Sequence, residues 1–317
     1  MHILVFGAGA VGGYFGGRLA QAGRNVTFIA RGQHLRAMQR DGLSVRSIEG
    51  DFTIHPIRAT ADPSAVEQAD AVLVTVKAWQ VPDAAAALRP LMGPGTFVVP
   101  LENGVEAPAQ LAEILGTERV LGGMCKIIST VAEPGHIHHR GISPLIAFGE
   151  LNGRRSQRAE RLLEAFAGTQ GIKAMIPPDI QAAMWEKFLF IAPFSGLGAL
   201  TRAPIGVLRS LPETRGLLEK AMREIVVLAQ SRGVHLGEEA VDEAMAFVDS
   251  LPAQGTASMQ RDVMTGRPSE LEAQNGAVVR LAREEAMDAP THRFIYAALL
   301  PQELASRQRS RPDKSSP

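Results

Sequence analysis

The chain has 317 residues, of which 45% are hydrophobic and 21% are charged, and its formal net charge at pH 7 is zero. These values are typical of a globular protein long enough for two domains and exclude wholesale disorder. Because 33 basic residues balance 33 acidic ones, the charge gives no support for binding to nucleic acid or to a membrane surface. The single cysteine, Cys125, excludes an intrachain disulfide and a cysteine-rich metal site and fits a reducing compartment.

The apolar segments are too short for a signal peptide or a membrane span. The chain begins HILVFGAGAVGG, a short apolar run without a basic flank, which predicts a strand. The later apolar stretch 188–200 is shorter than about 18 residues and is broken by Pro193, Gly196 and Gly198. We therefore expect a cytoplasmic protein.

Over the first half of the chain, short β-branched runs alternate with helical patterns. The expected parallel strands are Ile3–Phe6, Val26–Ala30, Ala71–Val76, Thr96–Pro100 and Val120–Met124. The expected helices are 11–22, 33–41, 80–92 and 105–115. This alternation predicts a doubly wound α/β sheet of the Rossmann type. Around 130–150 the sequences GHIHHRG and PLIAFGE predict antiparallel strands that close the domain.

After the prolines at 177 and 178 the pattern becomes wholly helical. The clearest segments are Gly216–Ser231, Glu238–Val248, Ser269–Met287 and 291–306. We predict an N-terminal Rossmann domain at 1–178 and an all-helical domain at 179–307. The polar residues 308–317 predict a disordered tail.

The sequence GAGAVG directly follows the first strand and opens a helix. Gly7 permits a tight turn, Gly9 lets the backbone approach a pyrophosphate, and Gly12 permits close packing of helix and strand. Its position in a strand–helix unit makes it a stronger indication of dinucleotide binding than the motif alone. The predicted cofactor loop comprises Gly7, Ala8, Gly9, Ala10, Val11 and Gly12.

Two cations indicate which dinucleotide binds. The second strand ends in Ala30–Arg31, where NAD-binding proteins carry an acid for the ribose hydroxyl. A guanidinium suits a 2′-phosphate instead, so NADP(H) is favoured. Lys77, at the end of AVLVTVK, is a candidate for a second cofactor cation and is equally compatible with an ordinary solvent-exposed position.

A lysine lies within the apolar stretch AMWEKFLFIAPFSG, residues 183–196. On a helix, Ile191 and Ser195 share the face of Lys187, and aromatic residues occupy the others. Burying an unpaired cation costs several kcal/mol or causes loss of its proton. The alternative is a side chain that extends along the apolar surface into solvent.

Two further polar segments are candidates for the site. In SELE, Ser269 and Glu272 fit a capping box, which leaves Glu270 as the functional candidate. Asn103 and Gly104 follow a predicted strand at the edge where open α/β sheets bind ligands. In HIHH, His136 and His138 share one face of a predicted strand and His139 lies on the other, with no carboxylate at the usual ligand spacing, so we expect no metal site.

Together these segments resemble the ketopantoate reductases (2-dehydropantoate 2-reductases), from the first strand to about residue 300. The motifs that carry the resemblance are GAGAVG, ARG, TVKAWQ, ENG, WEKF, SMQRD and SELEAQNG. The resemblance implies an NADPH-dependent oxidoreductase of pantothenate biosynthesis. It also implies that a Rossmann domain and a helical domain enclose NADPH and a 2-keto acid.

The resemblance implies a role for each matching residue. Lys187 would be the general acid that protonates the new hydroxyl. Glu270 and Asn103 would contact both substrate and cofactor, and Ser258 the substrate.

Three further positions are placed by the same resemblance. Arg31 and Lys77 would be the cofactor cations, and the backbone near Ile127 would lie beside the nicotinamide. The match at Ile127 needs a small insertion in the alignment.

The sequence departs from the family pattern beyond the lysine. Ile191, Ser195 and, approximately, Ile205 stand where the family has asparagines. Ser195 stays a candidate for substrate binding, but the pocket loses amide groups. Ketopantoate is the first expectation, and a more apolar 2-keto acid is the alternative.

Other functions stay open on the sequence alone. One is a β-hydroxyacid or opine-type dehydrogenase, and another is a catalytically silent NADP(H) sensor. We expect a small-molecule partner and no nucleic acid or membrane partner. The last helices leave a homodimer open.

Overall fold

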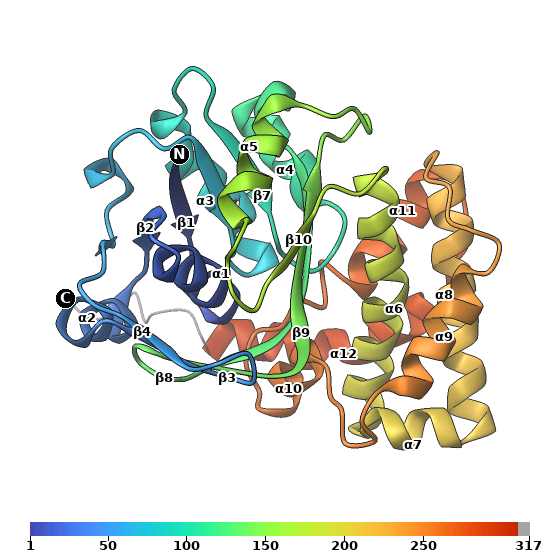
Figure 1. The fold of residues 1–317 in the computed structure, drawn as a ribbon. Coiled ribbons are helices and arrows are strands. Elements are labelled where there is room, and N and C mark those ends of the chain that lie inside the picture. The colour runs from blue at the N-terminus through green and yellow to red at the C-terminus, as the bar shows by residue number, and fades with distance from the viewer. Residues whose placement is uncertain (310–317) are drawn as a thin grey trace. The chain divides into compact units, whose positions relative to one another are not determined.

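The computed structural model describes residues 1–309 (Figure 1). The described residues form two compact units, one of residues 1–102 and 106–183 and one of 103–105 and the residues from 184 on. The predicted boundary at 178 lies just before helix α6 (Ile180–Thr201), and the division between the units falls inside this helix. Helix α12 (Pro290–Arg309) runs through residues 308 and 309, which the predicted tail included, and the rest of that tail lies outside the described residues.

The first unit contains a parallel sheet of five strands in the order β5-β2-β1-β6-β7. Its strands are β1 (His2–Phe6), β2 (Asn25–Ile29), β5 (Ala59–Thr60), β6 (Ala71–Val74) and β7 (Phe97–Pro100). The helices of this part are α1 (Ala10–Gln21), α2 (Gly32–Asp41), α3 (Val81–Leu88) and α4 (Ala107–Leu115). The predicted doubly wound parallel sheet is confirmed.

A second sheet, of mixed direction, belongs to the same unit. It has the order β10-β9-β3-β4, with β8 paired to β9. Its strands are β3 (Leu43–Ser47), β4 (Phe52–Ile54), β8 (Gly122–Glu133), β9 (His136–Gly149) and β10 (Lys173–Met175). The prediction that GHIHHRG and PLIAFGE form antiparallel strands is wrong, because both segments belong to one strand, β9, which pairs antiparallel with β8.

The predicted parallel strand Val120–Met124 is wrong. Val120 forms an isolated parallel bridge with Val98, and the chain then enters β8, where Gly122 to Lys126 pair antiparallel with β9. Residues 122–126 pair with β9 because β9 provides a long antiparallel partner. The sequence of this segment is that of a buried strand and does not show whether its partner is parallel or antiparallel.

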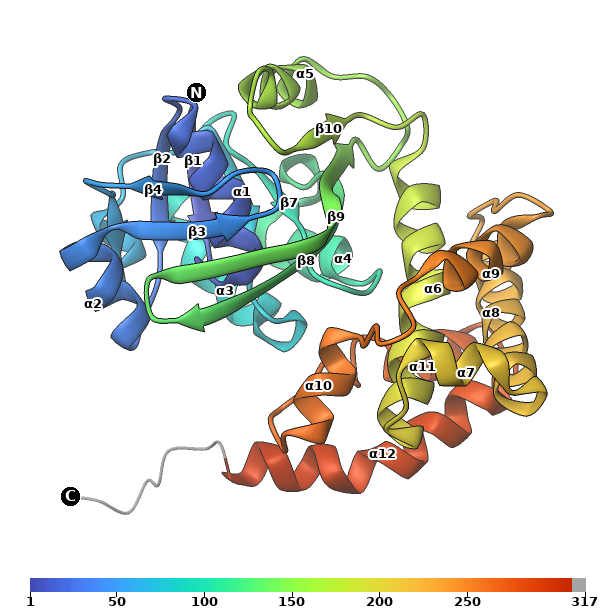
Figure 2. The ribbon, with the colours of Figure 1, turned by 60° about the horizontal axis from the view of Figure 1, so that its bottom comes forward.

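Helix α1 contacts both sheets (Figure 2), and glycines on different faces of the helix permit these contacts. A Cβ on Gly16 would lie 2.6 Å from Phe28 and Val5 of the parallel sheet. A Cβ on Gly17 would lie 3.1 Å from Phe52 of the second sheet. The glycine-rich sequence of α1 thus makes the helix thin enough to fit between two layers.

The other face of the parallel sheet packs on α3 and α4. Side chains alternate along each strand, so Leu4 and Phe6 of β1 point to this face while Ile3 and Val5 point to α1. Burial on both faces explains why these strands are continuously apolar. Helix α5 (Gln157–Phe166) packs on the second sheet, with Phe166 6.1 Å from the ring centroid of Phe148.

The second unit is helical throughout its described part, which confirms the predicted helical region. Besides α6 and α12 it contains α7 (Ile205–Ser210), α8 (Pro212–Ser231), α9 (Ala240–Ser250), α10 (Ser258–Met264) and α11 (Asn275–Glu284). None of the helices formed by residues 1–309 has both the length and the apolar character that crossing a bilayer requires.

The predicted capping box at Ser269 is wrong, because α11 begins only at Asn275. The Ser269 hydroxyl donates to the buried carboxylate of Glu303 at 2.6 Å. Glu272 instead accepts hydrogen bonds from Arg280 and Tyr296. A charged acceptor from a distant helix has replaced the local cap, which sequence spacing does not reveal.

A buried histidine links four helices of this unit. The Asn275 amide donates to the Ala192 carbonyl at 3.2 Å and to Nδ1 of His292 at 3.1 Å. The other ring nitrogen, Nε2, then donates to the Ala221 carbonyl at 3.1 Å. Burial lowers the pKa of His292 to about 4, against the smaller opposing effect of the Glu224 carboxylate. The neutral ring is therefore the form that holds α6, α8, α11 and α12 together.

This histidine should make the protein less stable in acid. The folded-state pKa of about 4 lies below the ordinary 6.5, so its contribution is complete above pH 6.5 and is lost as the pH falls towards 4. We expect a loss on the order of 3 kcal/mol across this window. The His292→Gln variant, which keeps a donor and an acceptor, should lack this part of the pH dependence in urea unfolding. Equal slopes for wild type and variant would contradict the assignment.

Candidate active site

The predicted cofactor loop lies between β1 and α1. Gly7 has a φ of +110°, and the N–H groups of Gly7 and Ala8 donate to the Ile29 carbonyl at 3.1 and 2.9 Å. Gly9 is the N-cap of α1 and provides no side chain to cap the helix. A Cβ on Gly9 would meet no atom within 4 Å. The residues present therefore fit a pyrophosphate, because the start of α1 can be approached closely at Gly9.

The glycines of this loop should respond differently to alanine. A methyl group on Gly12 would overlap the Gly7 carbonyl and the Thr75 hydroxyl, so Gly12→Ala should destabilise the fold by about 1–3 kcal/mol. Gly9→Ala should melt like the wild type and bind NADPH roughly tenfold more weakly or worse, because its methyl group occupies the cofactor side. Thermal unfolding without cofactor and fluorescence titration with NADPH measure the two effects. Identical behaviour of both variants would refute this division of roles.

Two side chains that sequence reasoning missed hold this loop. The Thr75 hydroxyl donates to the Gly7 carbonyl at 2.7 Å. His34 lies 2.8 Å from the Ala8 carbonyl through Nε2, while its Nδ1 accepts the Gly135 N–H at 3.1 Å. Burial lowers the pKa of His34, which fits a neutral ring with its proton on Nε2. Thr75 lies near the end of a predicted strand, and that position could have identified it as a residue of the site. No sequence feature near His34 indicates its contacts.

The two predicted cofactor cations follow strands that flank β1. Arg31 is the exposed N-cap of α2, just after β2. Lys77 is half-buried after β6, and its ammonium lies 5.8 Å from the ring centroid of Trp79. Since β2, β1 and β6 are adjacent and parallel, Arg31, the glycine loop and Lys77 follow the same edge of the sheet.

Ile127 lies at an irregularity in β8. The register between β8 and β9 shifts between Lys126 and Ile128, so that Ile127 lies opposite residues 141–144 of β9. The side chain is half-buried and packs against the core of the first unit. Bulges often reorient side chains beside active sites, so the position is compatible with the predicted role.

The second unit brings together Asn103 and Glu270. The Asn103 amide donates to the Glu270 carboxylate at 3.1 Å, and Glu270 is 4% exposed. Gly104 permits this approach, since it has a φ of +113° and a Cβ there would lie 2.7 Å from the Ala273 carbonyl. These two predicted site residues are therefore direct neighbours despite 167 positions of separation.

The predicted catalytic lysine is half-buried on α6. Trp185, Phe188 and Leu189 around it are buried, as the sequence predicted. Within residues 1–309 the Lys187 ammonium forms no hydrogen bond or ion pair. An ammonium without a protein partner keeps its three N–H donors available, so an anionic or carbonyl ligand can pair with it.

The predicted substrate serines also belong to this unit. Ser258 is the half-buried first residue of α10. Ser195 is fully buried, and its hydroxyl has no hydrogen-bond partner among the described residues. The side-chain amide of Gln274, which sequence reasoning missed, is also fully buried without one. Each such group costs roughly 1–3 kcal/mol. No side-chain hydrogen bond between described residues joins Lys187, Ser195 or Ser258 to the Asn103–Glu270 pair.

The isoleucines that depart from the family pattern differ in burial. Ile191 is half-buried on α6, one turn after Lys187, and Ile205 is fully buried at the start of α7. Of these two isoleucines, Ile191 is therefore the one whose side chain is accessible to a ligand.

The histidines of HIHH have structural roles or face solvent. His139 is buried and contacts the Ser47 hydroxyl at 2.8 Å and the Ile142 carbonyl at 2.9 Å, whereas His136 is exposed. Across residues 1–309, no group of three or more histidine, cysteine or acidic residues is arranged to hold a metal ion.

Comparison with protein families gives two matches that together span most of the chain. Residues 3–153 match the model described as Ketopantoate reductase PanE/ApbA. Residues 179–303 match Ketopantoate reductase PanE/ApbA C terminal.

Individual relatives match along almost their whole length. The uncharacterized oxidoreductase YkpB of Bacillus subtilis is 31% identical over 299 residues, covering 94% of this chain and 98% of that protein. The structure of 2-dehydropantoate 2-reductase from Geobacter metallireducens is 31% identical with a TM-score of 0.89, over 95% of this chain and 99% of that one. A ternary structure of D-mandelate dehydrogenase with NADH and anilino(oxo)acetate has a TM-score of 0.88 over 97% of this chain and 100% of that one. At 20% identity it shows the fold alone.

Proposed function

Because the chain belongs to the ketopantoate reductase family of oxidoreductases, we propose that it reduces 2-dehydropantoate to pantoate with NADPH. When bound, NADPH supplies the hydride that adds to the 2-keto carbon. The protein's own residues must then bind the cofactor, orient the keto acid and give a proton to the carbonyl oxygen.

Cofactor binding is assigned to the carboxyl edge of the parallel sheet. The loop Gly7–Gly12 would take the pyrophosphate, supported by the open space at Gly9. Arg31 would pair with the 2′-phosphate, supported by its exposure next to that loop. Lys77 would add a second positive charge.

Lys187 would donate the proton. As hydride adds to the 2-keto carbon, the carbonyl oxygen becomes an alkoxide, and the ammonium both polarises the ketone and protonates that oxygen. The observation that carries this proposal is that Lys187 is half-buried and that its ammonium has no partner among the described residues.

The remaining polar residues would orient the substrate. Asn103 and Glu270 hold each other at 3.1 Å, which fixes the amide rotamer before a ligand arrives. Ser258 and the unpartnered Ser195 hydroxyl would hydrogen-bond the keto acid. A ligand that satisfied Ser195 would remove the cost of leaving that hydroxyl unpaired.

Ile191 supports a second candidate, a reductase of a more apolar 2-keto acid. It places a half-buried aliphatic side chain one turn from Lys187, and an apolar wall binds an alkyl or aryl group better than a hydroxymethyl group. The alternative of a silent NADP(H) sensor is less well supported, because a sensor has no use for an unpaired lysine.

A substrate panel tests these proposals. The loss of NADPH absorbance is followed with 2-dehydropantoate, 2-ketoisovalerate, phenylglyoxylate and a β-keto acid. Highest kcat/KM for 2-dehydropantoate supports the first proposal, and highest kcat/KM for 2-ketoisovalerate or phenylglyoxylate supports the second. Tight NADPH binding without turnover of any 2-keto acid would refute both.

A further inference from the structure

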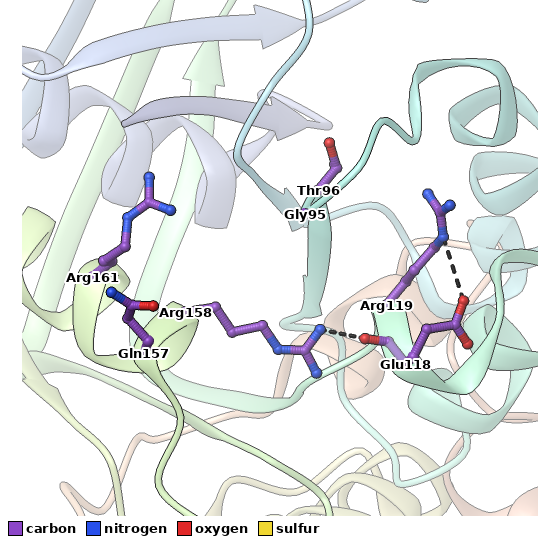
Figure 3. Close-up of a pocket in the computed structure, with 7 residues that line it drawn as sticks. All are labelled: Gly95, Thr96, Glu118, Arg119, Gln157, Arg158 and Arg161. Atoms are coloured by element: carbon purple, nitrogen blue, oxygen red, sulfur yellow. Dashed lines mark hydrogen bonds and ion pairs between the residues drawn. The ribbon is translucent and has the colours of Figure 1, made fainter.

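A cavity of about 310 Å³ in the first unit lies outside the predicted cofactor loop. Three segments line it: the turn before β7, the 3₁₀ turn Thr117–Arg119, and the start of α5 (Figure 3). The lining residues are Gly95, Thr96, Glu118, Arg119, Gln157, Arg158 and Arg161. We call this cavity the arginine pocket.

The arginine pocket lies at the opposite edge of the parallel sheet from the cofactor loop. Thr96 immediately precedes β7, and Arg119 immediately precedes Val120, which bridges β7 in parallel. The cofactor loop and Lys77 instead follow the carboxyl ends of β1 and β6. A four-residue strand spans roughly 13 Å, so a ligand in the arginine pocket would not overlap a dinucleotide at the other edge.

Two of the three arginines, Arg119 and Arg161, each hydrogen-bond a protein acceptor through one nitrogen and have further N–H groups that could bind a ligand. Arg119 uses Nη1 on the Met92 carbonyl at 2.8 Å, and Arg161 uses Nη2 on Asp70 at 3.2 Å. A guanidinium has five N–H groups in a fixed plane, so several stay available on each. Anchoring lowers the entropy that is lost when a ligand binds.

Arg158 completes the pocket as a fixed wall. Its Nε and Nη2 donate to the two carboxylate oxygens of Glu150, both at 2.7 Å, and its Nη1 donates to the Glu118 carbonyl. Its guanidinium carbon lies 5.7 Å from the ring centroid of Phe97. Arg158 is the second residue of α5, where the partial positive charge of the helix start adds to its own.

The positive charge of the arginine pocket is partly compensated by three carboxylates, one of which, Glu118, itself lines the pocket. Glu150 and Asp70 offset Arg158 and Arg161, and the Glu118 carboxylate lies 3.6 Å from Arg119 with 73% of its side chain exposed. The pocket therefore offers N–H donors from several arginines rather than a strong net positive charge. Such donors match a tetrahedral oxyanion with several acceptor oxygens.

We propose that the arginine pocket binds a small phosphate-bearing metabolite. Its volume exceeds that of one phosphate group and falls at the lower end of small-molecule sites. The proposal does not depend on the reductase activity, because the arginine pocket lies at the other edge of the sheet.

Pyrophosphate is the probe for this site, measured by calorimetry on protein saturated with NADPH. Saturation fills the cofactor loop, so any remaining binding reports another site. We expect one pyrophosphate per chain, and binding at least tenfold weaker in Arg119→Gln and in Arg161→Gln. The matched control is Arg155→Gln, which removes the same charge from an exposed arginine that pairs with Glu160 outside the pocket.

Several results would overturn the proposal. Absence of binding heat in the NADPH-saturated protein, or equal weakening by all three variants, would show that there is no specific site. Citrate binding as tightly as pyrophosphate would refute the preference for phosphate. Unfolding curves of each variant verify that the fold is intact, and half-exposed Arg161 is the replacement expected to disturb it least.

Discussion

Replacing Lys187 by alanine should lower kcat by about 10²-fold or more while NADPH affinity stays nearly unchanged. The ammonium is needed where negative charge develops on the substrate oxygen, and general acid catalysis contributes roughly 10²- to 10⁴-fold. The phosphate groups of NADPH are assigned to the glycine loop and Arg31 of the first unit, so the Kd for NADPH should change little with this substitution. Steady-state rates and NADPH titrations of the same preparation give both quantities.

Lys220→Ala is the matched control for this experiment. Lys220 is exposed on α8 in the same helical unit and loses the same charge and side-chain length. It should leave kcat within about twofold of the wild type, as is usual for a surface residue far from the chemistry. An unchanged kcat in Lys187→Ala would remove this residue from the mechanism.

Arg31→Ala should weaken NADPH binding by about 10- to 100-fold and leave NADH binding nearly unchanged. A charge-assisted hydrogen bond to the 2′-phosphate contributes roughly 1.5–3 kcal/mol, and NADH has no such phosphate. The Arg31 side chain is exposed, so its removal should not disturb the fold. Parallel titrations with both cofactors measure the change in preference.

Arg36→Ala is the control for Arg31, because it is an exposed arginine on the same helix. The Arg36→Ala substitution should change the affinities for NADPH and NADH only slightly and to the same extent. If Arg31→Ala weakened NADPH and NADH to the same extent, the assignment of a 2′-phosphate site would be wrong.

The parallel sheet and its glycine loop could be predicted because their signals are local. Continuous apolar strands, helix periodicity and the GAGAVG sequence all lie within short windows. We did not predict that α1 packs against two sheets. The glycines on the two contacting faces, such as Gly16 and Gly17, are the sequence feature that could have indicated it.

The second sheet could not be predicted in detail because its pairing is between distant segments. Strand β3 pairs in parallel with β9, about ninety residues later, and carries the polar residues Ser44 and Arg46. The error at Val120–Met124 and the error at Ser269 have the same origin. In each case a distant partner, β9 or Glu303, overrides a local pattern.

The candidate site was partly accessible to sequence reasoning. The resemblance identified Lys187, Asn103 and Glu270, and the strand end predicted where Asn103 would lie. The direct bond between Asn103 and Glu270 depends on the path of the chain around Gly104. His34 and Gln274 were missed because their importance lies in three-dimensional contacts, or in the lack of a partner, which no spacing encodes.

Isotope transfer tests the central proposal most directly. The protein is incubated with 2-dehydropantoate and NADPH that carries deuterium on both positions of nicotinamide C4, and the product is analysed by mass spectrometry and proton NMR. Hydride transfer to the keto carbon predicts pantoate with one deuterium at C2 and none elsewhere. Pantoate formed without deuterium, or no reduced product from this or any other 2-keto acid, would contradict the account.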